Sequence, residues 1–441
     1  MFNHLDLTPW ECRRYAIADR LGLFGLCLLA FSGLTGSSLV DIGMVTLISA
    51  VLITLPECWQ TLRRDPLFWL SVVLVSYVLV RAYLAYLEFP ELRDARNPKL
   101  RDLLRVTGTI SVVAGLFLQR NPARRKLILA CAALGLVIWM LGEFRWDRVD
   151  QIGFTHRSIF DTNPNIVGLI SAAGMLGGLV WFLSSVARPI VNRAMGMAGS
   201  VLLTLFTTST LVLSQSRSAW LAAMLVVPAV ISIWLWVKAR RADGIYRLSA
   251  FSIGAISVLV LAIAVGPLAH VIGDRWDRTR SDVQALQTTD RDRAGSGNIG
   301  VRLTLWKIGA EAIRERPILG WGPGAGEMLV KDRPELPKAH KHFHNLYIEL
   351  WVSFGLIGLG LYLAVYMLFA RAIISQCKSG TASLEMLLFV LGALMLFAVV
   401  VLFQIRINDH TGVYYLVLLG TLAAANRARI SESHWNRRNS A

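Results

Sequence analysis

Charged residues are scarce in this chain. Asp, Glu, Lys and Arg together make up 17% of its 441 residues, whereas hydrophobic residues make up 55%. Soluble globular chains carry roughly 25% charged residues, so the composition excludes an ordinary soluble protein and indicates a membrane protein. The chain also lacks a P-loop, a dinucleotide-binding glycine fingerprint and a serine nucleophile elbow, so no motif indicates nucleotide binding or serine hydrolysis.

Acidic residues are fewer than basic ones, 29 against 45, which leaves a formal net charge of +16. Such a surplus can indicate nucleic-acid binding, but the Arg and Lys residues here lie mostly in short connections between apolar runs. This distribution is typical of signals that orient membrane helices and not of a basic groove. We therefore expect membrane lipids, and no nucleic acid, among the partners.

Apolar runs near the ~20 residues needed to cross a bilayer recur along the chain. They predict an all-α polytopic membrane protein with about twelve transmembrane helices, in a single integral membrane domain that covers residues 1–441. We expect the spans at residues 19–38, 41–56, 66–84, 103–119, 126–143, 164–185, 194–213, 217–237, 248–270, 344–370, 384–404 and 410–426.

The positive residues also predict the orientation. With both termini in the cytoplasm, the arginine-rich connections lie inside, as the positive-inside rule requires. Cysteine is rare, and none of the five residues then faces the oxidising side, because Cys12, Cys58 and Cys377 lie inside and Cys27 and Cys131 lie within spans.

This topology places one large loop, residues 272–343, outside the cytoplasm between the ninth and tenth spans. Its second half predicts an amphipathic helix, on which Val301, Leu305, Ile308 and Ala312 share a face and which Pro317 ends. Long loops are usually functional or disordered, and an internal helix favours function. No internal repeat is strong enough to suggest the inverted halves of a transporter.

The loop ends in KAHKHFHNLYIELW, which carries three alternating histidines and a glutamate just inside the next span. We predict that His344 is a general base, because a neutral imidazole accepts a proton near pH 7. Glu349 or a neighbouring amide would orient it, and His342 and Asn345 would lie on the substrate side. Two alternatives are a histidine that only anchors the helix start and a metal site that includes His340; flanking lysines disfavour the metal.

Arg217 follows a serine-rich turn, LSQSRSAW, between two spans. An arginine this close to the hydrocarbon region is costly unless it faces a partner or water, and a guanidinium binds phosphate oxygens through two parallel hydrogen bonds. We predict that Arg217 and Ser216 bind an anionic lipid headgroup. The alternative is an arginine that reaches ordinary headgroups.

A third cluster, HRSIFDTNPNIVG, contains Arg157, Asn163 and Asn165 at the start of a span. Its amides and side chains are suited to an anion or to sugar hydroxyls, although helix capping explains the asparagines equally well. Arg302, on the predicted amphipathic helix, is a further candidate for binding the anion.

These blocks together resemble the bacterial O-antigen ligase and polymerase superfamily. HNLYIELWVSFGLIGLGLY is similar to its shared signature, and Arg157 to Asn165, SRSAWLA and RLTLWKIGAEAIRERPILGWGPG are similar to its other blocks, in the same order. Within the superfamily the blocks are most like those of the lipopolysaccharide O-antigen ligase.

The resemblance implies a glycosyltransferase of the bacterial inner membrane with a periplasmic active site. The donor would be a glycan on undecaprenyl diphosphate and the acceptor a sugar hydroxyl of lipid A core, with inversion at the anomeric carbon and no cofactor or metal. The external helix would lie on the membrane surface over a cavity. Alternatives are an O-antigen polymerase, a protein O-oligosaccharyltransferase that uses the same donor and, from another class, a flippase or transporter of an anionic lipid-linked substrate.

Overall fold

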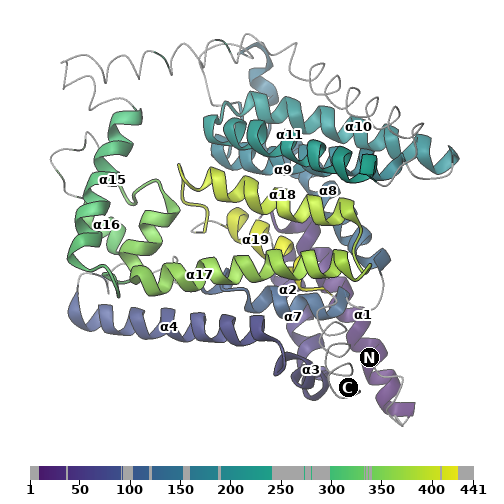
Figure 1. The fold of residues 1–441 in the computed structure, drawn as a ribbon, viewed down its shortest axis with the longest axis horizontal. Coiled ribbons are helices and arrows are strands. Elements are labelled where there is room, and N and C mark those ends of the chain that lie inside the picture. The colour runs from purple at the N-terminus through teal and green to yellow at the C-terminus, as the bar shows by residue number, and fades with distance from the viewer. Residues whose placement is uncertain are drawn as a thin grey trace.

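The structure is a computed structural model, and its described part is helical, with one isolated bridge between Phe144 and Phe160 (Figure 1). This confirms the predicted all-α membrane fold. It describes residues 9–35, 38–90, 92, 103–118, 122–151, 159–186, 190–240, 273, 280, 298–331, 333, 336, 340–407 and 410–425.

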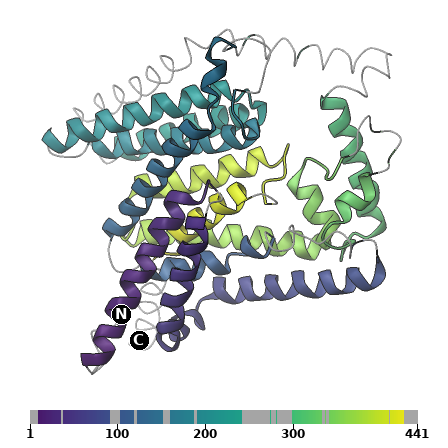
Figure 2. The ribbon, with the colours of Figure 1, turned by 180° about the vertical axis from the view of Figure 1, so that it is seen from behind.

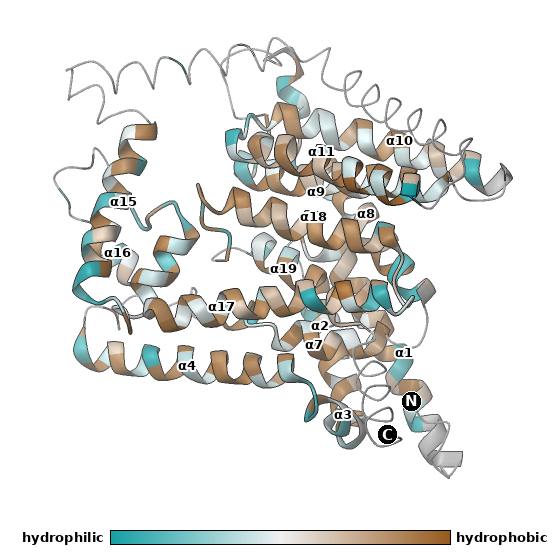
Figure 3. Ribbon diagram, in the orientation of Figure 1, coloured by the Kyte–Doolittle hydropathy of each residue, from teal (hydrophilic) through white to brown (hydrophobic). Residues whose placement is uncertain are grey.

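Seven described helices are long and apolar enough to cross a bilayer. They comprise most of α1 (Pro9–Ser32), α8 (Pro122–Glu143) and α10 (Ile190–Leu213), and all of α4 (Pro66–Glu88), α9 (Pro164–Ser185), α11 (Arg217–Arg240) and α17 (Leu346–Lys378). Apolar residues cover most of their length, as Figure 3 shows in brown.

Four shorter apolar segments accompany these helices at positions where the sequence predicts further spans. They are α2 (Ser38–Ile53), the stretch Leu103–Leu118 with α7 (Thr109–Gly115) and η1 (Leu116–Leu118), α18 (Leu384–Val400) and α19 (His410–Ala424). Short helices α3 (Leu55–Leu62) and η2 (Trp146–Gln151) connect spans. The span expected at 248–270 lies outside the described residues, so twelve spans stays a prediction.

Helix α9 is the most buried of the seven long helices, with 83% of its apolar window inside the protein. Small residues allow this, because they let neighbouring helices approach closely. A Cβ added at Gly168 would lie 2.5 Å from Ser216 Cβ, and one added at Gly178 would lie 2.5 Å from Thr204 Oγ1. The first contact brings the start of α9 against the start of α11.

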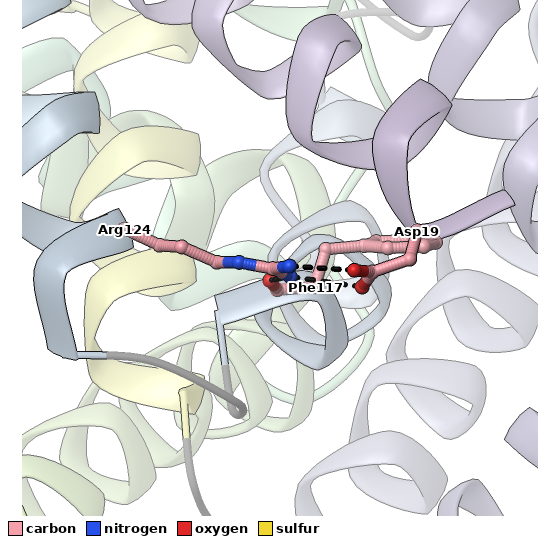
Figure 4. A network of polar contacts seen from close by, with 3 residues as sticks. All are labelled: Asp19, Phe117 and Arg124. Atoms are coloured by element: carbon pink, nitrogen blue, oxygen red, sulfur yellow. Dashed lines mark hydrogen bonds and ion pairs between the residues drawn. The ribbon is translucent and has the colours of Figure 1, made fainter. Parts of the chain in front are cut away.

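An ion pair joins two helices at the end of the bundle that the positive-inside rule predicts to be cytoplasmic. Arg124 on α8 donates to both carboxylate oxygens of Asp19 on α1, at 2.8 and 2.5 Å, and to the carbonyl of Phe117 at 2.8 Å (Figure 4). The contact holds α8 against α1 and η1, and Figure 2 shows α1 and α8 on the same side of the bundle.

The large loop contributes α15 (Asn298–Glu315) and α16 (Ala325–Val330), which stand together at one end of the bundle (Figure 1). The predicted face of α15 is confirmed: Leu305, Ile308 and Ala312 are buried. It packs in a separate core with α16, Phe343 and Val352. The protein itself thus covers this face, and the expected position of the helix on the membrane surface stays a prediction.

The end of this external segment is inserted into a break in α17. Gly355 has φ +65° and ψ −172°, and the backbone there leaves the helix. Trp321 N donates to Val352 O at 2.7 Å, and Leu356 N donates to Pro317 O at 2.9 Å. The prediction of one continuous span over 344–370 missed this break, whose open backbone groups are paired by the turn at 317–322.

Arg81 on α4 holds the same turn from the other side. Its buried guanidinium donates to the carbonyls of Leu319 and Gly320 at 2.8 and 2.7 Å. Arg316 pairs with Glu88 at 2.5 Å and lies over the rings of Phe89 and Trp321. These contacts fix the C-terminal end of α15 against α4 and thereby set the position of the whole helix.

Candidate functional site

The three histidines of the loop lie together directly before α17. The rings of His342 and His344 meet edge to face with centroids 4.2 Å apart, and that of His340 is 5.9 Å from His344. His344 has φ +53°, an unusual backbone angle for a residue other than glycine, and its N–H donates to His342 Nδ1 at 3.3 Å. Among the described residues, no group of three His, Cys, Asp or Glu side chains is placed to hold a metal ion.

The imidazole of His344 is neutral at physiological pH. Burial, as the largest cause, and the charges of neighbouring groups, among them His342, Arg302 and Arg406, together lower its pKa to about 3. Burial also lowers the pKa of His340. A neutral ring has an unprotonated nitrogen, as a general base requires.

Glu349 holds the histidine loop through its backbone. Its buried carboxylate accepts a hydrogen bond from Phe343 N at 3.4 Å. Gly326 on α16 lies against the same carboxylate, where an added Cβ would be 2.5 Å from Oε1. Phe343 precedes His344 directly, so this contact fits a positioning role for Glu349, whereas its predicted catalytic role stays a prediction.

Asn345 is the N-cap of α17. Its side-chain oxygen accepts from Tyr347 N at 2.9 Å and from Ile348 N at 3.2 Å, which satisfies two of the free amides at the helix start. Leu346 N donates to Val401 O at 2.9 Å. Asn345 therefore caps the helix, and its predicted place on the substrate side stays a prediction.

The Asn-Pro-Asn turn and the serine-rich turn also meet. Asn163 caps α9 by accepting from Asn165 N at 2.9 Å, and Asn165 Oδ1 accepts from the Ser216 hydroxyl at 3.1 Å. Ser216 is fully buried and lies 3.4 Å from the hydroxyl of Ser218. The structure thus joins two predicted clusters that are about fifty residues apart, and the close approach at Gly168 makes the contact possible.

Arg217 is the first residue of α11 and follows this network directly. Arg302 lies in the first turns of α15, half-buried, and its charge acts on His344. Arg157 lies outside the described residues, so its predicted role stays untested.

Sequence reasoning missed the segment 401–407, which connects α18 to α19. Gln404 donates from its buried amide to the Ser218 hydroxyl, and the charge of Arg406 acts on His344. The segment therefore lies between the Asn165–Ser216 network and the histidine loop. An arginine set between two isoleucines near the end of a span is the same kind of signal that identified Arg217.

The fold and site together define a polytopic α-helical membrane protein. At one end of its bundle, the charges of two arginines, Arg302 and Arg406, act on a neutral histidine. The family model described as O-antigen ligase matches residues 201–363. This range includes α11, α15, α16, the histidine loop and the first half of α17, so the resemblance to the O-antigen ligase superfamily is confirmed on this segment.

A relative of this chain is an uncharacterized protein of Haemophilus influenzae (strain Rd), which is 27% identical over 166 residues. The aligned segment covers 36% of this chain and 38% of that protein.

Proposed function

We propose that this protein transfers O-antigen polysaccharide from undecaprenyl diphosphate to a sugar hydroxyl of lipid A core. The reaction would take place at the periplasmic face of the bacterial inner membrane. The observation that carries the proposal is the neutral His344 beside positively charged groups at the start of α17. Transfer from a glycosyl diphosphate needs a base to deprotonate the acceptor hydroxyl and a cationic site to stabilise the leaving diphosphate.

His344 accepts the proton of the acceptor hydroxyl as the hydroxyl oxygen attacks the anomeric carbon of the donor. The bond between that carbon and the diphosphate oxygen breaks, and undecaprenyl diphosphate leaves with the electron pair. Attack opposite the leaving group inverts the anomeric centre. The energy comes from the donor bond itself, so no nucleotide is consumed.

Arg217 and Arg302 bind the diphosphate and stabilise its growing negative charge, with Arg157 as a further candidate. Guanidinium groups offer two parallel hydrogen bonds to phosphate oxygens, and fixed positive charge at a developing anion lowers the barrier. Asn163, Asn165 and Ser216 hold the turn beside Arg217. His342, Asn345 and Glu349 shape the backbone around His344.

The test is reconstitution of the purified protein in lipid vesicles with an undecaprenyl diphosphate glycan and purified lipid A core. We expect glycan on lipid A core, equal yield in excess EDTA, and a loss of at least about 100-fold in His344→Ala, the usual contribution of a general base. Longer chains on the lipid carrier would identify a polymerase instead. Full activity of His344→Ala would show that His344 is not the general base.

A flippase or transporter of the same lipid is the alternative from another class. Such a protein would move labelled undecaprenyl diphosphate glycan across vesicles without any acceptor. The same vesicles therefore decide between the two functions.

A further inference from the structure

We propose that Arg406 is a further substrate-binding residue of this site, which binds the diphosphate of the lipid-linked donor opposite Arg302. The inference rests on the proposed function and deepens it. It concerns a segment outside residues 201–363, the range that the family model matches.

Arg406 is buried in a segment without regular structure. Its exposed fraction is 8%, and its neighbours Ile405 and Ile407 are 5% and 2% exposed. A guanidinium stays charged in proteins, and burial of such a charge near a membrane is costly. Arg406 therefore places a buried positive charge in the segment that borders the histidine loop.

Three elements that carry proposed site residues hold this segment in place. On one side, Gln404 donates to Ser218 on α11, one residue after Arg217. On the other, Val401 accepts from Leu346 at the start of α17, two residues after His344. The ring centroids of Phe403 and Trp306 are 6.3 Å apart, and Trp306 lies on α15, the helix that carries Arg302.

The backbone of Arg406 is itself fixed. An added Cβ at Gly412 on α19 would lie 1.6 Å from the Arg406 carbonyl oxygen, so α19 packs directly on this backbone. Because the backbone is already fixed, ordering it adds little to the entropy cost of binding a ligand there.

The charge of Arg406 also acts on His344, on which Arg302 acts as well. Positive groups that share one neighbour repel each other, and an anion bound among them reduces that repulsion. A diphosphate diester carries two negative charges and several acceptor oxygens, so it can bind both guanidinium groups at the same time. The arrangement therefore fits a diphosphate better than it fits a neutral sugar.

The experiment measures binding of undecaprenyl diphosphate, without glycan, to the purified full-length protein in detergent. Arg406→Gln is expected to weaken binding at least about tenfold, which corresponds to about 1.4 kcal/mol. Arg406→Lys keeps the charge without the planar fork and is expected to be intermediate. Arg314→Gln, which removes an exposed arginine at the last turn of α15, is the matched control and should bind like the wild type.

Wild-type affinity in Arg406→Gln, with unchanged elution on gel filtration, would overturn the inference and leave the proposed function intact. Should Arg406→Gln not yield folded protein, Arg406→Lys decides, because its charge and length are close to those of arginine; affinity equal to that of the wild type would then overturn the inference. Failure of the wild type to bind undecaprenyl diphosphate would instead contradict the proposed function.

Discussion

At the scale of the residue, the basicity of His344 depends on what is bound beside it. With a pKa of about 3, the imidazole is always neutral at physiological pH, but it accepts a proton weakly. The causes are burial and the charges of nearby groups, including Arg302 and Arg406. A bound diphosphate opposes the effect of those charges and raises the pKa. The donor would therefore strengthen the base that its own transfer requires.

The pH dependence of transfer tests this coupling. The rate constant kcat/KM for the donor reports groups of the free enzyme, whereas kcat reports groups of the complex. A base with a lowered pKa stays unprotonated as the pH falls, so kcat/KM should remain constant from pH 8 down to about 5. The acidic limb of kcat should lie at higher pH than that of kcat/KM, because the bound diphosphate raises the pKa of His344 in the complex. We would measure both in the reconstituted assay.

An acidic limb of kcat/KM near the ordinary histidine pKa of about 6.5 would contradict this assignment. The residual activity of His344→Ala serves as the control, since its kcat should lack the acidic limb that belongs to the imidazole.

At the scale of the element, the break in α17 determines where the external segment sits. The turn at 317–322 pairs the backbone groups that the break leaves open, and Arg81 closes the other side of that turn. Because α15 ends at this turn, the break also fixes the position of Arg302. Helix α17 thus follows the histidine loop directly, and its break anchors α15, the helix that packs against Phe343 of that loop.

Gly355→Ala should disturb this anchor. The backbone angles there are accessible essentially only to glycine, at a cost of about 1–3 kcal/mol for other residues. An added Cβ would also lie 1.9 Å from Ile318 O. We expect a clear decrease in the Tm of the purified protein and a loss of activity.

Gly360→Ala is the matched control on the same helix. It lies one and a half turns further on, with nothing within 4 Å of an added Cβ. Its Tm should be unchanged or higher, because alanine favours a helix over glycine by up to about 1 kcal/mol. Equal Tm values for the two variants would show that the break does not constrain the fold.

At the scale of the whole molecule, the site lies at one end of the helical bundle. The histidine loop, the start of α11 and the segment 401–407 meet there through the hydrogen bonds of Asn165, Gln404 and Leu346. The charge distribution predicts that this end faces the periplasm, where lipid-linked glycans and lipid A core would both be accessible.

Site-directed labelling checks the orientation. In a variant without the five native cysteines, Arg314→Cys on α15 should react with a membrane-impermeant maleimide in intact spheroplasts. Ser379→Cys, which is exposed just after α17, should react only after the membrane is permeabilised. The opposite pattern would reverse the topology and place the site in the cytoplasm.

Local physical chemistry makes much of this protein predictable from its sequence. The length and hydropathy of each apolar run predict the helices, and the 3.6-residue period of α15 predicts its buried face. The histidine loop and the turns before α9 and α11 are identifiable because polar groups at the ends of membrane helices are costly.

The tertiary structure decides what those local patterns leave open. The break at Gly355 exists because a distant turn pairs its backbone, and Glu349 contacts a backbone amide because α16 lies against it. Arg406 belongs to the site because Ser218, Leu346 and Gly412 hold its segment beside His344. The contacts of the turn at 317–322 with α17, of Gly326 with Glu349, and of the 401–407 segment with Ser218 and Leu346 join residues far apart in the chain. Such pairings depend on packing among helices, which no single segment encodes.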